Sequence, residues 1–360
     1  MYLDDFKKDN CCGCTACKNI CPVNAISMVK DEEGFLYPQI DESKCINCNA
    51  CRNICPNIKK SSDNSIIESY GVKYKDTEQR RVSRSGGVFI SLSNYILNNN
   101  GIVYGAMLNE DLSVTHGRAE TKEERDRFKG SKYVQSDMGD TLKQVIEDLE
   151  NGRPVLFSGT SCQVAAVREF IPEHLSEQLY LCDLICHGVP SKKVFDDYVK
   201  YIEETNHKKV IKVDFRDKAF GWETHFETFY FDDGTKLSTE CFKKLFYGHS
   251  ILRPSCYLCN FANTHRPGDI TIADFWGINE INEEFNDHIG VSLTIINSEK
   301  GKAWFNNAKE ELEYFVCTLE DYIKRNYTLE YPTPASPQRE EFWEDYKSKD
   351  FKYILEKYVK

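Results

Sequence analysis

CCGCTACKNICP (residues 11–22) and CINCNACRNICP (residues 45–56) decide the first part of the fold. Both stretches have the spacing C-x-x-C-x-x-C-x-x-x-C-Pro, and each cysteine of the second lies 34 residues after its counterpart in the first. Three closely spaced thiolates can hold three irons of a cubane, while the fourth cysteine, held off by the proline, reaches the cluster of the other repeat. The spacing therefore predicts an internal repeat that binds two 4Fe-4S clusters.

The repeat assigns its cysteines to two crossed ligand sets. The first set is Cys11, Cys14, Cys17 and Cys55, and the second is Cys45, Cys48, Cys51 and Cys21. A zinc site is one alternative, but zinc usually takes two pairs of ligands rather than a run of four. A disulfide framework is another, but it requires an oxidising compartment, which nothing in the sequence indicates. We therefore expect a protein that transfers electrons.

Composition and charge exclude several classes of protein. The chain has 360 residues, and its 46 Lys and Arg against 57 Asp and Glu give a formal charge of −11. This acidic balance argues against a nucleic-acid partner, because phosphate binding requires basic patches. The stretch MYLDDFKKDN lacks the apolar run of a secretory signal, and no segment approaches the roughly 18 apolar residues of a membrane span. Sixteen cysteines then indicate reduced thiols and metal in a cytoplasmic protein of an anaerobic or microaerobic setting.

The repeat and the composition divide the chain into four parts. We predict a ferredoxin-like domain at residues 1–58, a polar linker at 59–66, a catalytic domain at 67–330 and a C-terminal extension at 331–360. The first domain should contain short strands at 25–29 and 35–40, and cluster binding should supply much of its folding energy. The expected fold class is α+β: a small bacterial-type ferredoxin domain followed by a mixed α/β catalytic domain.

Helix and strand patterns alternate within residues 67–330. Apolar spacing or capping residues predict helices at 88–97, after Thr121, and at 142–149, 164–170, 191–204 and after Ser298. Buried apolar runs predict strands at 101–108, 154–157, 179–185, 270–273 and 291–296. Residues 210–237 alternate around an Asp232-Asp233-Gly234 turn and resemble a hairpin. We expect a mixed sheet that need not be purely parallel.

Four further cysteines are candidates for a third cluster. Cys256 and Cys259 form one C-x-x-C, which alone fits a redox dithiol, half a zinc site or half a cluster site. Cys162 follows a strand at a predicted helix N-terminus, where the helix dipole should stabilise a thiolate. Cys186 closes a strand ahead of a His-Gly-Val-Pro sequence. The alternative is that Cys162 and Cys186 are small buried core residues. The remaining cysteines are interpreted as structural: Cys12, Cys182, Cys241 and Cys317. Of these, Cys182 is the substitute ligand if Cys186 does not bind the cluster.

Two glycine-containing stretches are candidates for a cofactor pocket. Ser85-Gly86-Gly87 precedes a predicted helix, where exposed amides suit an anionic group such as a pyrophosphate. The stretch from Gly130 to Ser136 offers a cation, an aromatic ring and hydroxyls within seven residues. Each stretch could equally be an ordinary helix start or a solvated loop. Beside iron-sulfur clusters they favour a flavin, because clusters carry single electrons and hydride chemistry needs a two-electron partner.

The same stretches, with three others, resemble the coenzyme F420 hydrogenase/dehydrogenase beta-subunit family. The matching motifs are SGG at 85–87, GSKYVQS at 130–136, VLFSGTSCQ at 155–163, DLICHGVPS at 183–191 and RPGDITIADFWG at 266–277. The resemblance covers roughly residues 1–280, with the ferredoxin repeat fused in front as in many members. It implies FAD and a 4Fe-4S cluster in the catalytic domain. It also implies electron transfer between a deazaflavin coenzyme, or another two-electron partner, and iron-sulfur clusters.

Carried over by motif, the resemblance implies two sets of site residues. The implied FAD contacts are Ser85, Gly86, Gly87, Lys132, Tyr133 and Ser136. The implied ligands of a third cluster are Cys162, Cys186, Cys256 and Cys259. Two departures from the family pattern, Ser161 in place of a proline and Ala273 in place of a glycine, leave the identity of the coenzyme open.

These features favour an iron-sulfur flavoprotein oxidoreductase. A two-electron donor or acceptor would meet FAD, and the clusters would connect the flavin to a ferredoxin or a partner subunit. His187 is the candidate catalytic residue, because it could donate a proton or form a hydrogen bond to a cluster beside Cys186. The alternative is a purely structural role. His265 and Asp274 have the same two interpretations. The rival functions are an electron-relay subunit with clusters only and a zinc-bearing scaffold.

Overall fold

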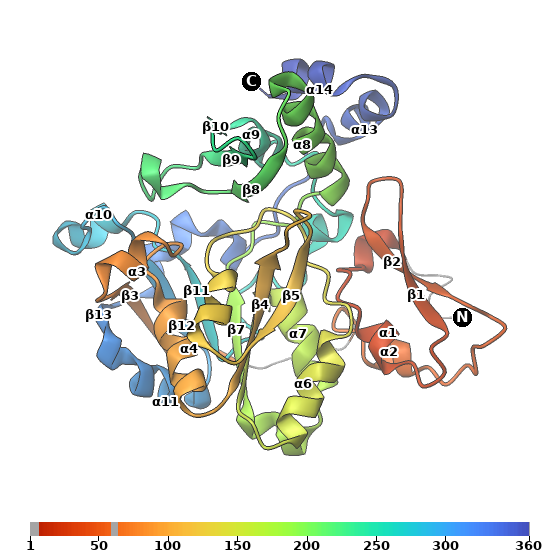
Figure 1. The fold of residues 1–360 in the computed structure, drawn as a ribbon. Helices are drawn as coiled ribbons and strands as arrows, with labels where there is room; N and C mark the ends of the chain where they lie inside the picture. Colours follow the sequence, from red (N-terminus) through yellow and green to blue (C-terminus); the bar gives the residue numbers. More distant parts are fainter. Residues whose placement is uncertain (1–6, 59–63, 360) are drawn as a thin grey trace.

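The computed structural model describes residues 7–58 and 64–359, so residues 59–63 of the predicted linker lie outside the described residues. Figure 1 shows a small N-terminal module beside a large α/β body, with a second sheet and the C-terminal helices above that body. The expected fold class, α+β with a ferredoxin-like domain ahead of a mixed sheet, is confirmed. Within the described part of the chain, no helix is both long and apolar enough to cross a bilayer.

The N-terminal module is a hairpin flanked by two short helices. Strands β1 (Ile26–Lys30) and β2 (Leu36–Ile40) pair antiparallel, within one residue of the prediction. The turn between them contains Gly34, whose φ of +85° is a conformation that glycine adopts without strain. Helices α1 (Ala16–Ile20) and α2 (Ala50–Asn53) begin at equivalent positions of the two sequence repeats.

An eight-stranded mixed sheet forms the centre of the body. Its strands are β3 (Glu68–Tyr74), β4 (Ile102–Leu108), β5 (Val114–Ala119), β6 (Val155–Thr160), β7 (Leu179–Leu184), β11 (Ile270–Asp274), β12 (Ser292–Ile296) and β13 (Leu312–Cys317). Their order is β13-β3-β12-β11-β7-β6-β4-β5, and the four strands from β11 to β4 are parallel. Because Thr160 of β6 lies beside Leu184 of β7, the segments that follow these two strands leave the sheet at the same edge.

Helices cover both faces of this sheet, because successive strand residues point to opposite sides. The covering helices are α4 (Val88–Asn98), α6 (Thr141–Glu150), α7 (Ser161–Phe170) and α11 (Glu299–Ala308). Tyr104 and Phe157 belong to the core that contains α6 and α7, whereas their neighbours Val103 and Leu156 belong to the core that contains α4 and α11. The sheet is therefore buried on both sides.

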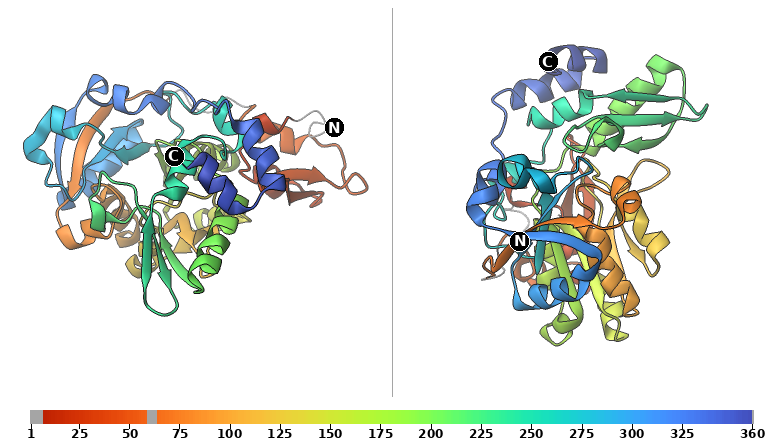
Figure 2. Two further views of the ribbon diagram at one scale, coloured as in Figure 1. Left: turned by 90° about the horizontal axis from the view of Figure 1, so that it is seen from above. Right: turned by 90° about the vertical axis from the view of Figure 1, so that its left-hand side faces the viewer.

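A second lobe stands above the sheet in Figure 1. It consists of the antiparallel strands β8 (Val210–Asp214), β9 (Glu227–Phe231) and β10 (Lys236–Thr239) with helices α8 (Lys192–Asn206), α9 (Cys241–Tyr247), α13 (Arg339–Ser348) and α14 (Phe351–Tyr358). The helices enclose an aromatic core that includes Tyr198, Phe242 and Trp343. The C-terminal helices also approach the N-terminal module (Figure 2), and Lys347 of α13 forms an ion pair with Glu32 at 2.6 Å.

The sequence patterns predict most of these elements but not all. The predicted helices at 88–97 and 142–149 and the predicted strands at 179–185 and 291–296 are confirmed with small shifts at their ends. The patterns do not predict β3, β5 or β13, which pair antiparallel with their neighbours: β13 and β3 at one edge of the sheet and β5 at the other. The remaining α-helices are short: α3 (Thr77–Arg81), α5 (Lys122–Arg125), α10 (Ile278–Asn282) and α12 (Leu319–Tyr322).

Candidate redox site

The two N-terminal cysteine stretches fold with the same backbone conformation. Gly13 and Thr15 have φ angles of 71° and 61°, and their counterparts Asn47 and Asn49 have φ angles of 56° and 59°. Left-handed residues on both sides of the second cysteine bend each stretch into a tight loop. A β-branched threonine rarely adopts this conformation, and here Asn19 donates a hydrogen bond to the Thr15 carbonyl oxygen at 3.0 Å. The sequence repeat is therefore also a structural repeat.

The fourth cysteine of each stretch lies with the cysteines of the other stretch. Electrostatic interactions link Cys55 with Cys11 and Cys17, and they link Cys21 with Cys51. One small pocket is lined by all members of the second predicted set: Cys21, Cys45, Cys48 and Cys51. This is the arrangement that the crossed ligand sets require, although the ligand sets themselves stay predictions.

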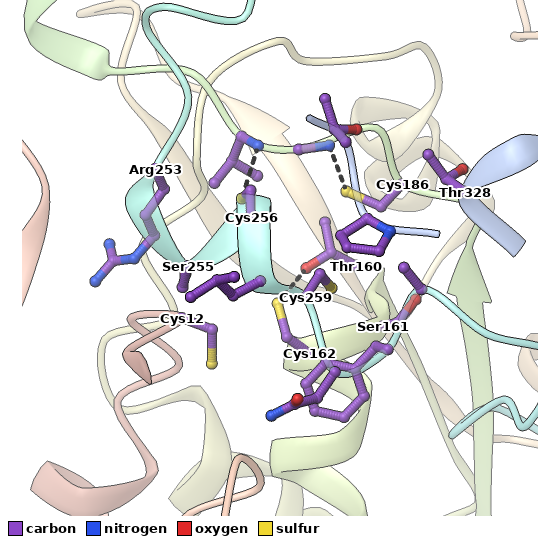
Figure 3. Close-up of a pocket in the computed structure, with 18 of the residues that line it drawn as sticks. Cys12, Thr160, Ser161, Cys162, Cys186, Arg253, Ser255, Cys256, Cys259 and Thr328 are labelled. Carbon is purple, nitrogen blue, oxygen red and sulfur yellow. Dashed lines mark hydrogen bonds between the residues drawn. The ribbon is translucent and has the colours of Figure 1, made fainter. Parts of the chain in front are cut away.

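A third group of thiols converges where β6, β7 and the 3₁₀ segment η5 (Pro254–Leu258) meet (Figure 3). Each of its four members interacts electrostatically with the other three, and all of them line one pocket: Cys162, Cys186, Cys256 and Cys259. Backbone amides point at two of the sulfurs. Gly188 N lies 3.4 Å from Cys186 Sγ, and Val189 N lies 3.5 Å from Cys256 Sγ.

Ionisation of the thiols in this group is unfavourable while no metal is bound. The neighbouring Cys12 thiol and burial raise the pKa of the Cys162 thiol well above its usual range. Burial likewise raises the pKa of Cys186 to about 12 and that of Cys259 to about 11. Thiolates at these positions therefore require a positively charged metal centre.

Cys12, interpreted from the sequence as structural, belongs to this pocket. Its side chain is buried and lines the pocket together with Cys162. Cys14 is a predicted ligand of an N-terminal cluster, and Cys162 is a predicted ligand of the third cluster. The contact between the two groups escapes the sequence analysis because Cys12 and Cys162 are 150 residues apart in the chain.

Arg253 fixes the N-terminal module against the pocket. Its side chain is 0% exposed, and its Nε donates a hydrogen bond to the Cys11 carbonyl oxygen at 2.6 Å. Its Nη2 donates to the Leu36 carbonyl oxygen at 2.8 Å. Gln135 accepts from Arg253 Nη1 at 2.9 Å and donates to the Cys12 carbonyl oxygen at 2.7 Å. A buried cation with directional acceptors on both domains specifies one docked orientation.

A larger cleft, of about 370 Å³, opens beside the cysteine pocket. Its walls come from segments far apart in the sequence, including the start of α4, the loop after Phe128, the segment after β7 and the end of β11. Four consecutive residues line both spaces: Cys186, His187, Gly188 and Val189. A ligand in the cleft would therefore lie against the third cysteine group.

Five of the six predicted cofactor contacts line this cleft: Ser85, Gly87, Lys132, Tyr133 and Ser136. Gly86 is not among its lining residues. Gly86 instead packs between β3 and β12, where a Cβ would meet the Val72 carbonyl oxygen at 2.1 Å. The structure thus gives Gly86 a packing role, whereas the other five line the cleft.

Lys132 lines this cleft. Its Nζ donates hydrogen bonds to the backbone carbonyls of Arg127, Phe128 and Lys129 at 2.9–3.2 Å. Burial lowers the pKa of its ammonium group to about 7. A phosphate in the cleft would favour the charged form of Lys132. By contrast, the Ser85 hydroxyl already donates to the Val291 carbonyl oxygen at 2.6 Å.

One wall of the cleft carries a buried group of charges. Asp274 accepts a hydrogen bond from Arg216 Nη1 at 2.5 Å and lies 3.5 Å from Arg84 Nε. Burial opposes ionisation of Asp274, but the two guanidinium groups outweigh it and lower the pKa of the carboxyl group to about 2. Two cations against one carboxylate leave this wall positive. The aromatic rings of Tyr133 and Trp276 line the same cleft, which therefore suits a ligand with an anionic part and an aromatic part.

His187 lies where the cleft and the cysteine pocket meet. Its Nε2 is 2.7 Å from His249 Nε2, and its Nδ1 is 3.2 Å from the Tyr327 hydroxyl. Burial and the neighbouring His249 lower the pKa of His187 to about 4, so the imidazole is neutral at pH 7. Its catalytic role stays a prediction. Cys182 and His265, the other candidates raised by the sequence, line neither space.

Comparison with known proteins gives two matches to family models. Residues 152–321 match the model for the C terminus of the coenzyme F420 hydrogenase/dehydrogenase beta subunit, and residues 10–57 match a 4Fe-4S dicluster domain. The fold resembles a chain of the F420-reducing NiFe hydrogenase complex from Methanosarcina barkeri, with 18% identity and a TM-score of 0.50 over 71% of this chain and 85% of that chain. No curated protein matches the chain.

Proposed function

We propose that this chain is an iron-sulfur flavoprotein oxidoreductase. Through residues 152–321 it belongs to the coenzyme F420 hydrogenase/dehydrogenase beta-subunit family, and it carries a 4Fe-4S dicluster domain at residues 10–57. The family is one of oxidoreductases, and the cluster domain makes redox electron transfer the general function. The finer proposal is that a two-electron donor or acceptor reacts at FAD in the cleft. Electrons then pass between the flavin and the clusters, and between the clusters and a ferredoxin or a partner subunit.

The observation that carries this proposal is the wall shared by the cleft and the third cysteine group. Residues Cys186–Val189 line both spaces, so a flavin ring at that wall would lie beside a cluster. The cleft, at about 370 Å³, falls within the roughly 300–1,000 Å³ of an ordinary small-molecule pocket. Bound FAD would supply the exchange between two-electron and one-electron chemistry.

The residues that line the cleft fit such a cofactor. Lys132 offers a cation whose hydrogen bonds reach only backbone carbonyls, and Arg84 and Arg216 keep one wall positive. These groups would neutralise a pyrophosphate. Tyr133 would offer a ring for stacking, because its own ring is held by the neighbouring ring of Phe246 at a centroid distance of 4.9 Å. We infer that these residues bind and orient the flavin.

The third cysteine group fits a cubane better than a single metal ion. Its four thiols are buried and interact with one another, and two of their sulfurs accept hydrogen bonds from backbone amides. Among residues 7–58 and 64–359, no three metal-binding side chains lie close enough to hold one ion. A cubane requires wider spacing of its ligands than a zinc ion does, because the cluster itself separates them. The zinc-scaffold alternative thus gains no support from this geometry.

The clusters would lie in a defined order. The Cys11 stretch packs against Arg253, and Cys12 lines the same pocket as Cys162. The second N-terminal group lies farther out, since Cys48 is exposed and Ile46 beside it is 60% exposed. Electrons would therefore pass between the cleft and the surface through the third cluster, the near N-terminal cluster and the distal one in turn.

Anaerobic purification with counts of iron, sulfide and flavin tests the proposal. We expect about twelve irons and twelve sulfides per chain, together with one FAD. Reduction of the flavin by reduced coenzyme F420 or by a nicotinamide, followed by reduction of ferredoxin, would identify the two-electron partner. Clusters without retained or added FAD would instead identify an electron-relay subunit, and zinc without sulfide would identify a scaffold.

A further inference from the structure

We propose that Arg266 holds together the three chain segments that carry the ligands of the third cluster, and that Ser161 is its contact on the segment of Cys162. This inference rests on the proposed function, because it presupposes that the third cysteine group binds a cluster. Arg266 and Ser161 would be positioning residues, since they hold the segments that carry the ligands and bind no iron themselves.

The four cysteines of this group come from three separate segments of the chain. Cys162 lies at the start of α7, Cys186 follows β7, and Cys256 and Cys259 lie in the η5 segment and directly after it. A cubane sets the distances between its ligands, so the three segments must be held at fixed positions for a cluster to fit between them. Something other than the cysteines themselves has to hold these positions.

The Arg266 guanidinium contacts the chain beside each of the three segments, and Arg266 lines the cysteine pocket. Its Nη2 donates hydrogen bonds to the Ser161 hydroxyl at 2.6 Å and to the Leu184 carbonyl oxygen at 2.8 Å. Its Nη1 donates to the Phe261 carbonyl oxygen at 2.9 Å. Each of these acceptors lies within two residues of a predicted ligand, and each belongs to a different segment. One side chain therefore connects all three.

A buried carboxylate fixes the orientation of this guanidinium. Asp183 Oδ2 lies 2.5 Å from Arg266 Nη2, and the two side chains are 0% and 1% exposed. Asp183 Oδ1 accepts a second hydrogen bond, from the Thr271 hydroxyl of β11 at 2.6 Å. Because both carboxylate oxygens have partners in the core of the sheet, Asp183 keeps one orientation, and the planar guanidinium keeps its orientation with it.

Ser161 makes one of these connections particular to this chain. Its hydroxyl accepts from Arg266 and donates to the Leu184 carbonyl oxygen at 3.1 Å, so it joins the start of α7 to the end of β7. The side chain of a proline, the residue of the family pattern at this position, could form neither hydrogen bond. The serine thus connects the segment of Cys162 to a guanidinium that also contacts the other two segments.

A general stabilising role for a buried ion pair is the competing interpretation. Arg266→Lys distinguishes the two, because it keeps the positive charge beside Asp183 and loses the fork of donors. One ammonium nitrogen replaces the two Nη atoms that reach Ser161 and Phe261 separately. The fold should therefore persist in this variant, while the ligand segments lose their common contact.

The test measures iron release from anaerobically purified, full-length protein. Wild type, Arg266→Lys and Ser161→Ala are compared with Arg125→Lys, a control that changes a buried arginine outside the pocket, whose Nη1 donates to the Ile90 carbonyl oxygen on α4. Iron is counted first, and its release to a chelator is then followed with time. Electron paramagnetic resonance of the reduced protein identifies the cluster that is lost, because Cys256→Ala should lack the same signal.

The inference predicts a selective effect on one cluster. We expect about twelve irons per chain in wild type and in Arg125→Lys, released at similar rates. In Arg266→Lys about four irons should leave more than about tenfold faster, while the remainder keep their wild-type rate. Ser161→Ala should release the same irons about fivefold faster, which is the effect expected for the loss of one hydrogen bond.

Two outcomes overturn the inference. Faster release of all the irons at one rate in Arg266→Lys would leave the ion pair only a general stabilising role, and wild-type release in both Arg266→Lys and Ser161→Ala would remove the positioning role altogether. If Arg266→Lys does not fold, Ser161→Ala, which changes no charge, decides between selective and wild-type release. Wild-type protein with only about eight irons would instead overturn the proposed function, and its iron count separates that failure from the others.

Discussion

Arg253 Nε donates a hydrogen bond to the carbonyl oxygen of Cys11, across 242 residues of chain. The same guanidinium lies 4.4 Å from the centre of the Tyr37 ring, a cation–π distance. One buried side chain therefore contacts both a cluster loop and the hairpin of the N-terminal module. The distance between the near cluster and the third cluster depends on this docking.

Replacing Arg253 should loosen the module. Arg253→Met removes the donors to the carbonyl oxygens of Cys11 and Leu36 and leaves both buried acceptors unpaired, at a cost of about 1–3 kcal/mol each. We expect a clear fall in unfolding free energy and faster hydrogen exchange of the backbone amides in residues 7–58. Arg81→Met removes an exposed arginine and should change stability by less than about 0.5 kcal/mol. Equal behaviour of the two variants would contradict the docking role.

Iron content tests the third cysteine group. Cys256→Ala removes one of four thiols that interact with each other, so we expect the loss of about four irons per chain while the N-terminal pair of clusters remains. Cys317→Ala, which removes a thiol outside the pocket, should keep the full iron content. An unchanged iron count in Cys256→Ala would exclude Cys256 as a ligand.

The sequence predicts the elements whose signals are local. Ser191 and Ser298 cap α8 and α11 as expected, because each hydroxyl accepts from an amide three residues later. The β1–β2 hairpin follows from a turn of a few residues. By contrast, β3 is identified only by its partners β12 and β13, which lie more than 200 residues away. Strand pairing at that separation leaves no pattern in a single segment.

The sequence likewise predicts only part of the candidate site. The spacing of Cys11 to Cys55 predicts two clusters, and motif matching selects the third group. Neither could identify Arg253 or Cys12, since the groups that they lie beside come from the other domain. The thiolate at Cys162 stays a prediction, because burial and the neighbouring Cys12 raise the pKa of this thiol while a bound metal would lower it.

The distal cluster should be needed for export of electrons but not for chemistry in the cleft. Cys48 is exposed and far from the shared wall at Cys186–Val189 in the proposed order. We expect Cys48→Ala to lower ferredoxin reduction at least tenfold, to order of magnitude, while flavin bleaching by the two-electron donor keeps its wild-type rate. Ile46→Ser, which changes the exposed neighbour, should retain the cluster and the transfer. Undiminished ferredoxin reduction in Cys48→Ala would refute the proposed path.

Flavin affinity should depend on pH through Lys132. Burial lowers the pKa of Lys132 to about 7 in the ligand-free chain, and a bound pyrophosphate would favour the charged ammonium and raise that pKa again. Binding above pH 7 must therefore take up a proton, so the Kd for FAD should rise with pH, by at most about tenfold per unit. Below pH 7 the lysine is already charged and the Kd should level off.

Lys132→Arg keeps its charge at every accessible pH and should remove the pH dependence of the Kd, because the guanidinium does not titrate there. Lys132→Ala should bind FAD about tenfold more weakly at pH 6.5, with a difference from wild type that shrinks toward pH 9. Titration calorimetry of all three proteins from pH 6 to 9 measures these slopes. A wild-type slope that persists in Lys132→Arg would assign the proton to another group and remove Lys132 from the proposed phosphate site.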